Sequence, residues 1–256
     1  DALGRVLTNT STRGLFLALF PLWVKWKIAG SVSLYPRDVA EGNEGLVDII
    51  TARTRYFDAV IQRQSNQVSQ FVVLGAGYDT RSYGPLSDSE TTVFEVDQAT
   101  VQEHKKAMLA LSGVDTSRVT FVTVDFSQDD LFKRLIANGF DATKPTLFLW
   151  EGVTLYLTEE MVRKSMADIH ENAAMGSVLL ADLYALRFTN MAQGKYLDKV
   201  LKYTNERVHF GLAMDVDWEE SLATFVESNS WQLGARYFMG SSSRKGPYMV
   251  VCEMLR

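Results

Sequence analysis

The sequence predicts an α/β protein with a mostly parallel sheet and a closing antiparallel hairpin. Three observations support this fold class. From Gln67 onward, short β-rich runs alternate with helical patterns, which is typical of βαβ units. Several β-rich runs end in a glycine-rich turn or a carboxylate, where open α/β sheets bind ligands. The last two apolar runs flank a turn rich in glycine and serine, residues 240–246. Together they predict a Rossmann-like sheet with a C-terminal hairpin.

Seven strands are expected from apolar, β-branched and aromatic runs. In chain order they cover residues 71–74, 92–96, 119–124, 146–150, 178–181, 231–238 and 248–254. Helices are expected over residues 99–111, from about 129 to 138, over 159–174 and over 218–228. Thr158 is the expected N-cap of the third helix, because two glutamates follow it. Asn138-Gly139 suits the left-handed end of the second helix. The stretch 184–217 has weaker periodicity.

The N-terminal quarter of the chain precedes the alternating strand and helix patterns of the rest. Residues 1–66 are expected to form a helical arm or lid packed on the core, and residues 67–256 a single globular domain. The apolar run 14–24 is about half of the roughly 20 residues that a spanning helix needs, and Pro21 interrupts it. We therefore expect no transmembrane span. A packed lid is favoured over a segment lying on a membrane surface, and a signal peptide cleaved near residue 30 is disfavoured.

The net charge and the cysteine content limit the partners, disulfides and metals that we expect. A formal net charge of -5 argues against a nucleic-acid partner, because such partners usually need a basic surface. Cys252 is the one cysteine, so no intramolecular disulfide can form, and we expect it to be buried in the last strand. This cysteine usage suits a cytoplasmic protein. The sequence has no cluster of histidine and cysteine at metal-ligand spacing, and we expect no metal.

The turn after the first strand distinguishes between nucleotide ligands. A dinucleotide enzyme favours three glycines at fixed spacing, but here Thr80 follows Gly75 and Gly77 at the third position. Asp79 would also lie near an anionic pyrophosphate. Asp97, about twenty residues on, can accept hydrogen bonds from two ribose hydroxyls. Nicotinamide dinucleotides and S-adenosylmethionine both have such a ribose. The turn therefore favours a ligand without a pyrophosphate.

Three segments together resemble the leucine carboxyl methyltransferase family. They are Leu74-Gly-Ala-Gly-Tyr-Asp-Thr80, Phe94-Glu-Val-Asp97 and Trp150-Glu-Gly-Val-Thr-Leu-Tyr-Leu157, with a further match at 52–58. The resemblance covers roughly residues 46–183. It implies the class I methyltransferase sheet, in which the last strand enters antiparallel, and S-adenosylmethionine as the cofactor of the domain 67–256. The family includes enzymes that methylate a protein C-terminal leucine as well as polyketide O-methyltransferases.

The resemblance also implies a role for each matching residue. Arg53 would bind the cofactor carboxylate, and Gly75 and Gly77 would let the backbone approach the methionine portion. Asp97 would hold the ribose. Asp125 and Phe126 would contact the adenine, and Glu151 would lie near the methionine portion and the methyl group. Glu95 points to the opposite face of its strand, so we give it no such role.

The acceptor is the least determined part of the prediction. A small acceptor of secondary metabolism, methylated on a carboxylate or hydroxyl oxygen, suits the apolar arm and the aromatic content. A carboxylate needs no general base, whereas a hydroxyl would benefit from one. Tyr156 and His209 are the candidate catalytic residues, and His104 and His170 are expected to be structural. The alternatives are a protein C-terminal carboxyl methyltransferase, a nicotinamide-dependent oxidoreductase and a non-catalytic nucleoside-binding module. The oligomeric state is left open.

Overall fold

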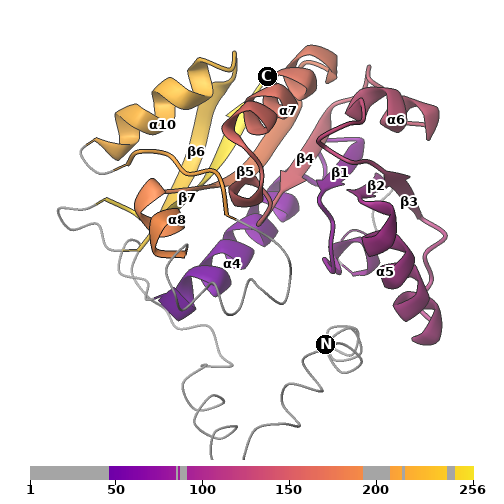
Figure 1. Cartoon of the computed structure of the whole chain (residues 1–256). Helices are drawn as coiled ribbons and strands as arrows, with labels where there is room; N and C mark the ends of the chain where they lie inside the picture. The colour runs from indigo at the N-terminus through magenta and orange to yellow at the C-terminus, as the bar shows by residue number, and fades with distance from the viewer. Residues whose placement is uncertain (1–45, 85, 87–90, 193–207, 215–216, 241–245) are drawn as a thin grey trace, which may run out of the picture.

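A computed structural model of the chain describes residues 46–84, 86, 91–192, 208–214, 217–240 and 246–256 (Figure 1). Its seven-stranded sheet has the order β3-β2-β1-β4-β5-β7-β6. Strands β1 to β5 pair in parallel, whereas β7 is antiparallel to both β5 and β6. The predicted Rossmann-like sheet with an antiparallel hairpin is therefore confirmed. The strands are β1 (Gln70–Leu74), β2 (Thr92–Asp97), β3 (Val119–Thr123), β4 (Thr146–Trp150), β5 (Val178–Tyr184), β6 (Gln232–Met239) and β7 (Met249–Leu255).

The helices expected over 99–111, 129–138, 159–174 and 218–228 are present, close to the predicted bounds. The described helices are α4 (Leu46–Gln64), α5 (Ala99–Leu111), α6 (Leu131–Ala137), α7 (Glu159–Asn172), α8 (Leu186–Ala192) and α10 (Trp218–Glu227), with short 3-10 turns η1 (Arg81–Tyr83) and η2 (Thr154–Tyr156). Thr158 caps α7 as expected, its side chain accepting from the Met161 amide. Helix α6 begins later than expected because Asp130 is its N-cap, accepting from the Lys133 amide. No helix was predicted where α8 lies, since its residues have weak periodicity.

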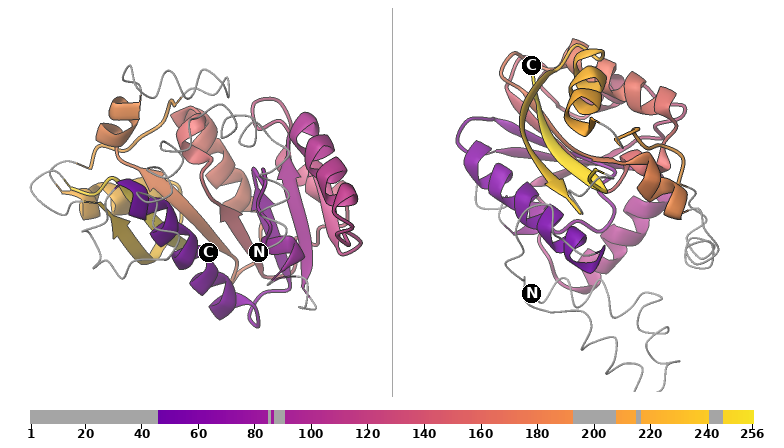
Figure 2. Two further views of the ribbon diagram at one scale, coloured as in Figure 1. Left: turned by 90° about the horizontal axis from the view of Figure 1, so that it is seen from below. Right: turned by 90° about the vertical axis from the view of Figure 1, so that its left-hand side faces the viewer.

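Apolar side chains cover both faces of the sheet, as a sheet with helices on each side requires. In β4, Leu147 and Leu149 belong to the core cluster that includes α4, whereas Phe148 and Trp150 belong to the cluster formed with α6, α7 and α10. Figure 2 shows these helices on opposite sides of the sheet. Glu95 lies on the α4 side, where it pairs with Lys105 of α5 at 2.7 Å, and both side chains are buried. This agrees with its expected orientation.

Helix α4 is also joined to strand β7, which lies between β5 and β6, by a buried carboxylate. Arg63 donates to Glu253 of β7 at 2.5 Å, and the Tyr56 hydroxyl donates to the same carboxylate at 3.3 Å. Phe57 and Val60 of α4 are fully buried in the core. Residues 46–64 thus pack into the same core as β1, and this packing positions any side chain that α4 presents to the strand ends.

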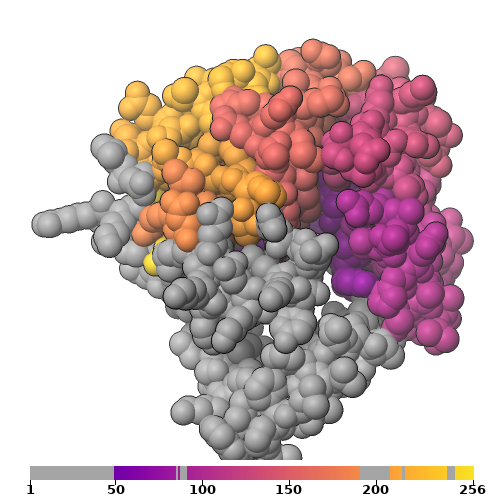
Figure 3. All heavy atoms as spheres, in the orientation of Figure 1, coloured from indigo at the N-terminus to yellow at the C-terminus, as the bar shows by residue number. Residues whose placement is uncertain are grey.

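The described residues form one continuous body in the space-filling view (Figure 3). Cys252 is buried in β7, as expected. Within this part of the chain, none of the helices combines the length and the apolar character needed to cross a bilayer. The apolar run 14–24 and the rest of the expected arm up to residue 45 lie outside the described residues, so the lid stays a prediction.

Candidate active site

The carboxyl ends of the parallel strands bring the predicted residues to one edge of the sheet. Strand β1 pairs with β2 on one side and β4 on the other, so the strand order reverses beside β1. Ligands of open α/β sheets bind at such a switch point. Gly75 follows β1, Asp97 ends β2 and Glu151 follows β4. The sequence predicts that these three residues lie at the carboxyl-terminal edge of the parallel strands, and the structure has them there.

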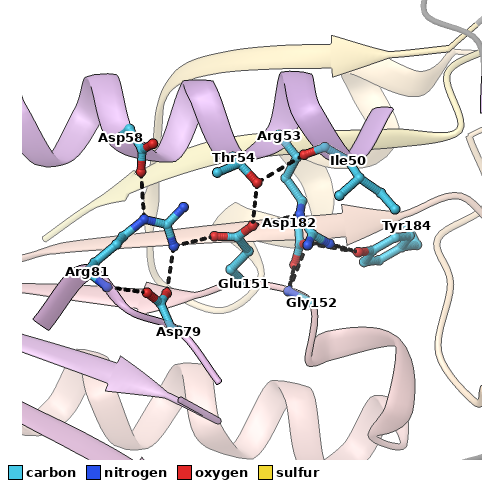
Figure 4. Close-up of polar contacts among 10 residues, drawn as sticks. All are labelled: Ile50, Arg53, Thr54, Asp58, Asp79, Arg81, Glu151, Gly152, Asp182 and Tyr184. Carbon is cyan, nitrogen blue, oxygen red and sulfur yellow. Dashed lines mark hydrogen bonds and ion pairs between the residues drawn. The ribbon is translucent and has the colours of Figure 1, made fainter. Parts of the chain in front are cut away.

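Arg53 reaches this edge from α4 and joins two strand ends (Figure 4). Its Nε donates to Glu151 Oε1 at 2.9 Å, and its Nη1 donates to Asp182 Oδ2 at 3.1 Å. Nη1 also donates to the Tyr184 hydroxyl at 2.8 Å. Burial opposes the charge of Arg53, but Tyr184, Asp182 and Glu151 more than compensate, so its pKa lies above the usual value. Arg53 is therefore a fixed cation at the sheet edge.

A second arginine, Arg81, holds the other side of Glu151. Its Nη1 donates to Glu151 Oε2 at 2.7 Å and to Asp79 Oδ2 at 2.6 Å, and its Nε donates to Asp58 at 2.6 Å. The Arg81 side chain is only 11% exposed. Glu151 is thus held between two guanidinium groups, one on each oxygen. Sequence reasoning missed Arg81, although it directly follows the glycine-rich segment ending at Thr80.

Asp182 and Tyr184 of β5 complete the network and were also missed. Both oxygens of Asp182 accept from the Gly152 amide, at 3.0 and 2.9 Å, and Tyr184 donates its hydroxyl proton to Oδ2 at 2.9 Å. The Asp182 side chain is fully buried. Burial raises the pKa of its carboxyl to about 6, against the opposing effects of Arg53 and the Gly152 amide. Asp182 therefore stays ionised at neutral pH, and the Tyr184 hydroxyl, whose pKa burial raises, stays protonated.

The glycine-rich turn after β1 contains two glycines with positive φ, and a side chain is excluded at the first of them. Gly75 has φ +64°, and a Cβ there would lie 2.5 Å from Val153 Cγ2. Gly77 also has a positive φ of +42°, and a Cβ there would lie 3.8 Å from the Gly75 carbonyl oxygen, an ordinary contact distance. Its amide donates to Asp97 Oδ2 at 2.6 Å. The backbone of this turn can therefore approach a ligand closely, as glycine permits.

Asp97 keeps acceptor capacity after its bonds within the protein. Its Oδ1 accepts from the Gln98 amide at 2.7 Å, and its Oδ2 accepts from Gly77. A carboxylate has about four lone-pair sites, so each oxygen can accept once more. Asp97 is partly exposed. It can therefore receive two neighbouring hydroxyl groups, as the ribose prediction requires.

Asp125 and Phe126 follow β3 at the same edge. Asp125 Oδ1 accepts from both the amide and the hydroxyl of Ser127, at 2.9 and 2.6 Å, so much of its carboxylate stabilises the turn. Oδ2 accepts only from Gln128, at 3.3 Å, among the contacts that the described residues make. Phe126 is partly buried and packs against the core. The turn thus leaves one carboxylate oxygen and one aromatic ring for a planar ligand.

The two catalytic candidates lie in segments that are joined by a backbone hydrogen bond. The His209 amide donates to the Leu155 carbonyl at 2.7 Å, which places His209 beside Tyr156 in the fold. Tyr156 is partly buried in η2, and His209 is exposed. His104 of α5 meets the Tyr78 hydroxyl at 2.7 Å, and His170 of α7 packs edge-on against Trp231. His170 therefore takes part in the packing around Trp231, whereas His104 contacts the glycine-rich turn through Tyr78. The structural roles expected for both histidines stay predictions.

The structure changes the interpretation of Asp79. Asp79 was expected to disfavour a pyrophosphate by its charge. In the structure its two oxygens accept from the Arg81 guanidinium and the Arg81 amide, at 2.6 and 2.8 Å. Since Arg81 balances much of this charge, Asp79 discriminates less against phosphate than the sequence suggested. Thr80 at the position of the third glycine still disfavours a dinucleotide ligand.

Comparisons with known proteins concern the family and the fold of the chain. The sequence profile of the leucine carboxyl methyltransferase family matches residues 22–170. A protein of Mycobacterium avium (strain 104), named "Putative S-adenosyl-L-methionine-dependent methyltransferase", is 34% identical over 168 residues, which cover 64% of this chain. The aligned region is 55% of that relative, so the chain spans little more than half its length.

Solved structures share the fold at low sequence identity. The methyltransferase domain of bacterial CtHen1-CN has a TM-score of 0.54 and 14% identity, covering 80% of this chain and 97% of that one. The 1,6-didemethyltoxoflavin-N1-methyltransferase of Burkholderia thailandensis, solved with 1,6-didemethyltoxoflavin and S-adenosylhomocysteine, has a TM-score of 0.50 and 16% identity, covering 81% and 80%. At these identities the likeness concerns the fold alone.

Proposed function

Because the chain belongs to the leucine carboxyl methyltransferase family, we propose that it transfers a methyl group from S-adenosylmethionine to an oxygen of a small acceptor. The acceptor oxygen is a carboxylate or hydroxyl, and the acceptor class is a secondary metabolite of polyketide or peptide type. The observation that carries the proposal is the charged network at the ends of β4 and β5, beside the glycine turn. The family match favours this activity over the nicotinamide-dependent oxidoreductase.

The charges of the network suit the methionine portion of the cofactor. The network has two guanidinium groups, on Arg53 and Arg81. These form ion pairs with the four carboxylates of Asp58, Asp79, Glu151 and Asp182, so negative charge is in excess. S-adenosylmethionine carries a sulfonium and an amino group as cations and one carboxylate as an anion. Arg53 is the residue for that carboxylate, because its Nη2 makes no hydrogen bond among the contacts of the described residues. Glu151 supplies negative charge for the cationic groups.

The other predicted cofactor residues supply the remaining contacts. Gly75 and Gly77 let the backbone approach the methionine portion, and Asp97 accepts from the ribose hydroxyls. Asp125 Oδ2 accepts from the adenine amino group, with Phe126 against the ring. S-adenosylmethionine supplies a methyl group activated by its sulfonium. The chain's own contribution is to orient the acceptor oxygen for in-line attack and to exclude water.

Tyr156 and His209 serve the acceptor. A carboxylate acceptor is already ionised at neutral pH, so these residues would only orient it. A hydroxyl acceptor has to lose a proton, and His209 is the base for that proton while Tyr156 orients the oxygen. His209→Gln should therefore lower kcat for a hydroxyl acceptor by about 10²-fold or more and change kcat little for a carboxylate.

The experiment is an acceptor screen with labelled methyl groups. Purified protein is incubated with S-adenosylmethionine, libraries of small carboxylic acids and phenols, and a peptide ending in leucine. Mild alkali then releases methanol from a methyl ester but leaves a methyl ether intact. Labelled small products in wild type and Arg63→Ala, but not in Arg53→Ala, support the proposal. Labelling of the peptide alone would support the protein carboxyl alternative. Labelling of no acceptor, although the cofactor binds, would favour a non-catalytic binding module.

A further inference from the structure

We infer that Asp182, together with the Tyr184 hydroxyl, positions Arg53 and the Gly152 turn for the carboxylate of the cofactor. This inference rests on the proposed function. Neither residue was predicted as part of the site, and we propose no direct contact between either residue and the cofactor. Asp182 and Tyr184 act through Arg53, so both are positioning residues.

The three side chains form a closed ring of hydrogen bonds. Arg53 Nη1 donates to Asp182 Oδ2 and to the Tyr184 oxygen, and Tyr184 donates its one hydroxyl proton to Asp182 (Figure 4). Each group is used in keeping with its chemistry, since a tyrosine hydroxyl can donate once and accept at the same time. The ring occupies Nη1 completely, and Glu151 occupies Nε. The guanidinium is thereby held with Nη2 as its remaining donor group.

Asp182 also shapes the turn that carries Glu151. Its carboxylate accepts twice from the Gly152 amide, and its backbone carbonyl accepts from the Thr154 hydroxyl at 2.6 Å. Gly152 has φ +72°, and a Cβ there would lie 3.3 Å from Arg53 Nη1. The guanidinium therefore lies directly against this turn. One buried carboxylate sets the positions of both Arg53 and the residues beside Glu151.

Stability alone does not explain a carboxylate at this position. The rest of β5 is buried and mainly apolar; the strand pairs with β7 along its whole length and with β4 from Val178 to Ala181. Burying an ion pair gives little net stability, since desolvation offsets most of the attraction, and apolar replacements are often as stable. A buried aspartate in such a strand is therefore best explained by its effect on the arginine that it holds.

The fold contains a matched control for this ring. Arg63, Glu253 and Tyr56 form a second set of arginine, buried carboxylate and tyrosine, which joins the same helix α4 to β7. Glu253 is 4% exposed, and among the described residues the side chains of this set make no hydrogen bond or ion pair with the Arg53 side chain. Glu253→Gln and Tyr56→Phe thus remove the same kinds of interaction without changing the ring around Arg53.

The experiment compares two ligands by calorimetry in five proteins. S-adenosylhomocysteine has the methionine carboxylate, whereas 5′-methylthioadenosine lacks the whole amino-acid portion. We expect Asp182→Asn to weaken S-adenosylhomocysteine binding by about tenfold, or roughly 1.4 kcal/mol, and Tyr184→Phe by about threefold. Affinity for 5′-methylthioadenosine should change less than twofold in both variants. Glu253→Gln and Tyr56→Phe should leave both affinities within about twofold of wild type.

The ligand pair separates positioning from folding. If Asp182→Asn weakened both ligands equally, Asp182 would serve the fold of the pocket, and the inference would be wrong. Unchanged S-adenosylhomocysteine affinity in Asp182→Asn would also overturn it, while leaving the proposed function intact. If wild type bound neither ligand, the proposed function itself would fail.

Discussion

Substitution of Gly75 by alanine tests the closest approach in the glycine turn. Two costs add at this position. The positive φ of +64° is strained for a residue with a Cβ, at about 1–2 kcal/mol. The new Cβ would also lie 2.5 Å from Val153 Cγ2. Carbon atoms prefer separations of about 3.5–4.0 Å, so Val153 would have to move by about 1 Å, and such overpacking costs about 1–3 kcal/mol.

Gly113 provides the matched control, because it has φ +65° with no atom within 4 Å of a Cβ. Gly113→Ala should therefore lose only the backbone part, about 1–2 kcal/mol, whereas Gly75→Ala should lose about 2–5 kcal/mol. In a chain of this size each kcal/mol lowers Tm by about 2–4 °C. Thermal and chemical denaturation measure both variants, and calorimetry with S-adenosylhomocysteine should show lost affinity in Gly75→Ala alone.

The double variant Gly75→Ala/Val153→Ala tests the contact itself. Removing the Val153 methyl groups should relieve the crowding, so the loss in the double variant should be smaller than the sum of the single losses by about 1–3 kcal/mol. Additive losses, or a Gly75→Ala variant as stable as Gly113→Ala, would contradict the close contact between Gly75 and Val153.

Three further predictions concern the charged groups of the site. Arg81→Met leaves Asp79 and Glu151 without the cation that they share. The variant should lower the free energy of unfolding by about 3 kcal/mol and weaken S-adenosylhomocysteine binding in calorimetry. The control Arg134→Met breaks an exposed ion pair with Asp129 and should cost less than about 1 kcal/mol. Asp97→Ala removes the acceptor proposed for two ribose hydroxyls and should weaken binding by about tenfold or more, while Asp115→Ala, which alters an exposed turn, should have no effect. Binding should also weaken as the pH falls from 7 to 5 in wild type but not in Asp182→Asn, because the pKa of Asp182 is about 6 and only its ionised form holds Arg53. An equal pH dependence in both proteins would assign the effect to a group other than Asp182.

The sign of the stability effect of Asp182 is opposite to that of its effect on binding. Its neighbours are Arg53 from α4, Glu151 after β4, Tyr184 on β5 and the Cys252 thiol on β7. Folding raises the pKa of Asp182 above its usual value of 3.8, so the folded protein disfavours its charge. The contribution of Asp182 to stability is therefore full at pH values below 3.8 and is lost as the pH rises through about 6. Binding, in contrast, should improve over that range.

Most of the fold could be predicted because its signals are local. The apolar run 146–150 matches β4, and the helix over 99–111 matches α5. The last strand pair was recognisable from the glycine- and serine-rich turn between two apolar runs. Strand β5 was predicted to end at Ala181, but it extends to Tyr184. A charged residue normally ends a buried strand, and the sequence alone does not show that Arg53, 129 positions away, balances Asp182.

The site was predictable where family motifs mark it and incomplete where long-range pairing builds it. Gly75, Asp97 and Glu151 each follow a recognisable strand, so their convergence follows from the parallel sheet. Arg81 and Asp182 take part through ion pairs between distant segments, and no spacing rule indicates such pairs. One usable signal was present, since Asp182 lies near the end of its strand like Asp97.

The central claim is tested most directly by calorimetry on the wild-type chain. S-adenosylmethionine and S-adenosylhomocysteine are titrated into wild type, Arg53→Ala and Arg63→Ala, with NADH as the competing nucleotide. We expect both methionine-derived ligands to bind wild type and Arg63→Ala, and Arg53→Ala to bind them at least about tenfold more weakly. We expect no binding of NADH. Binding of NADH without S-adenosylmethionine would contradict the central claim.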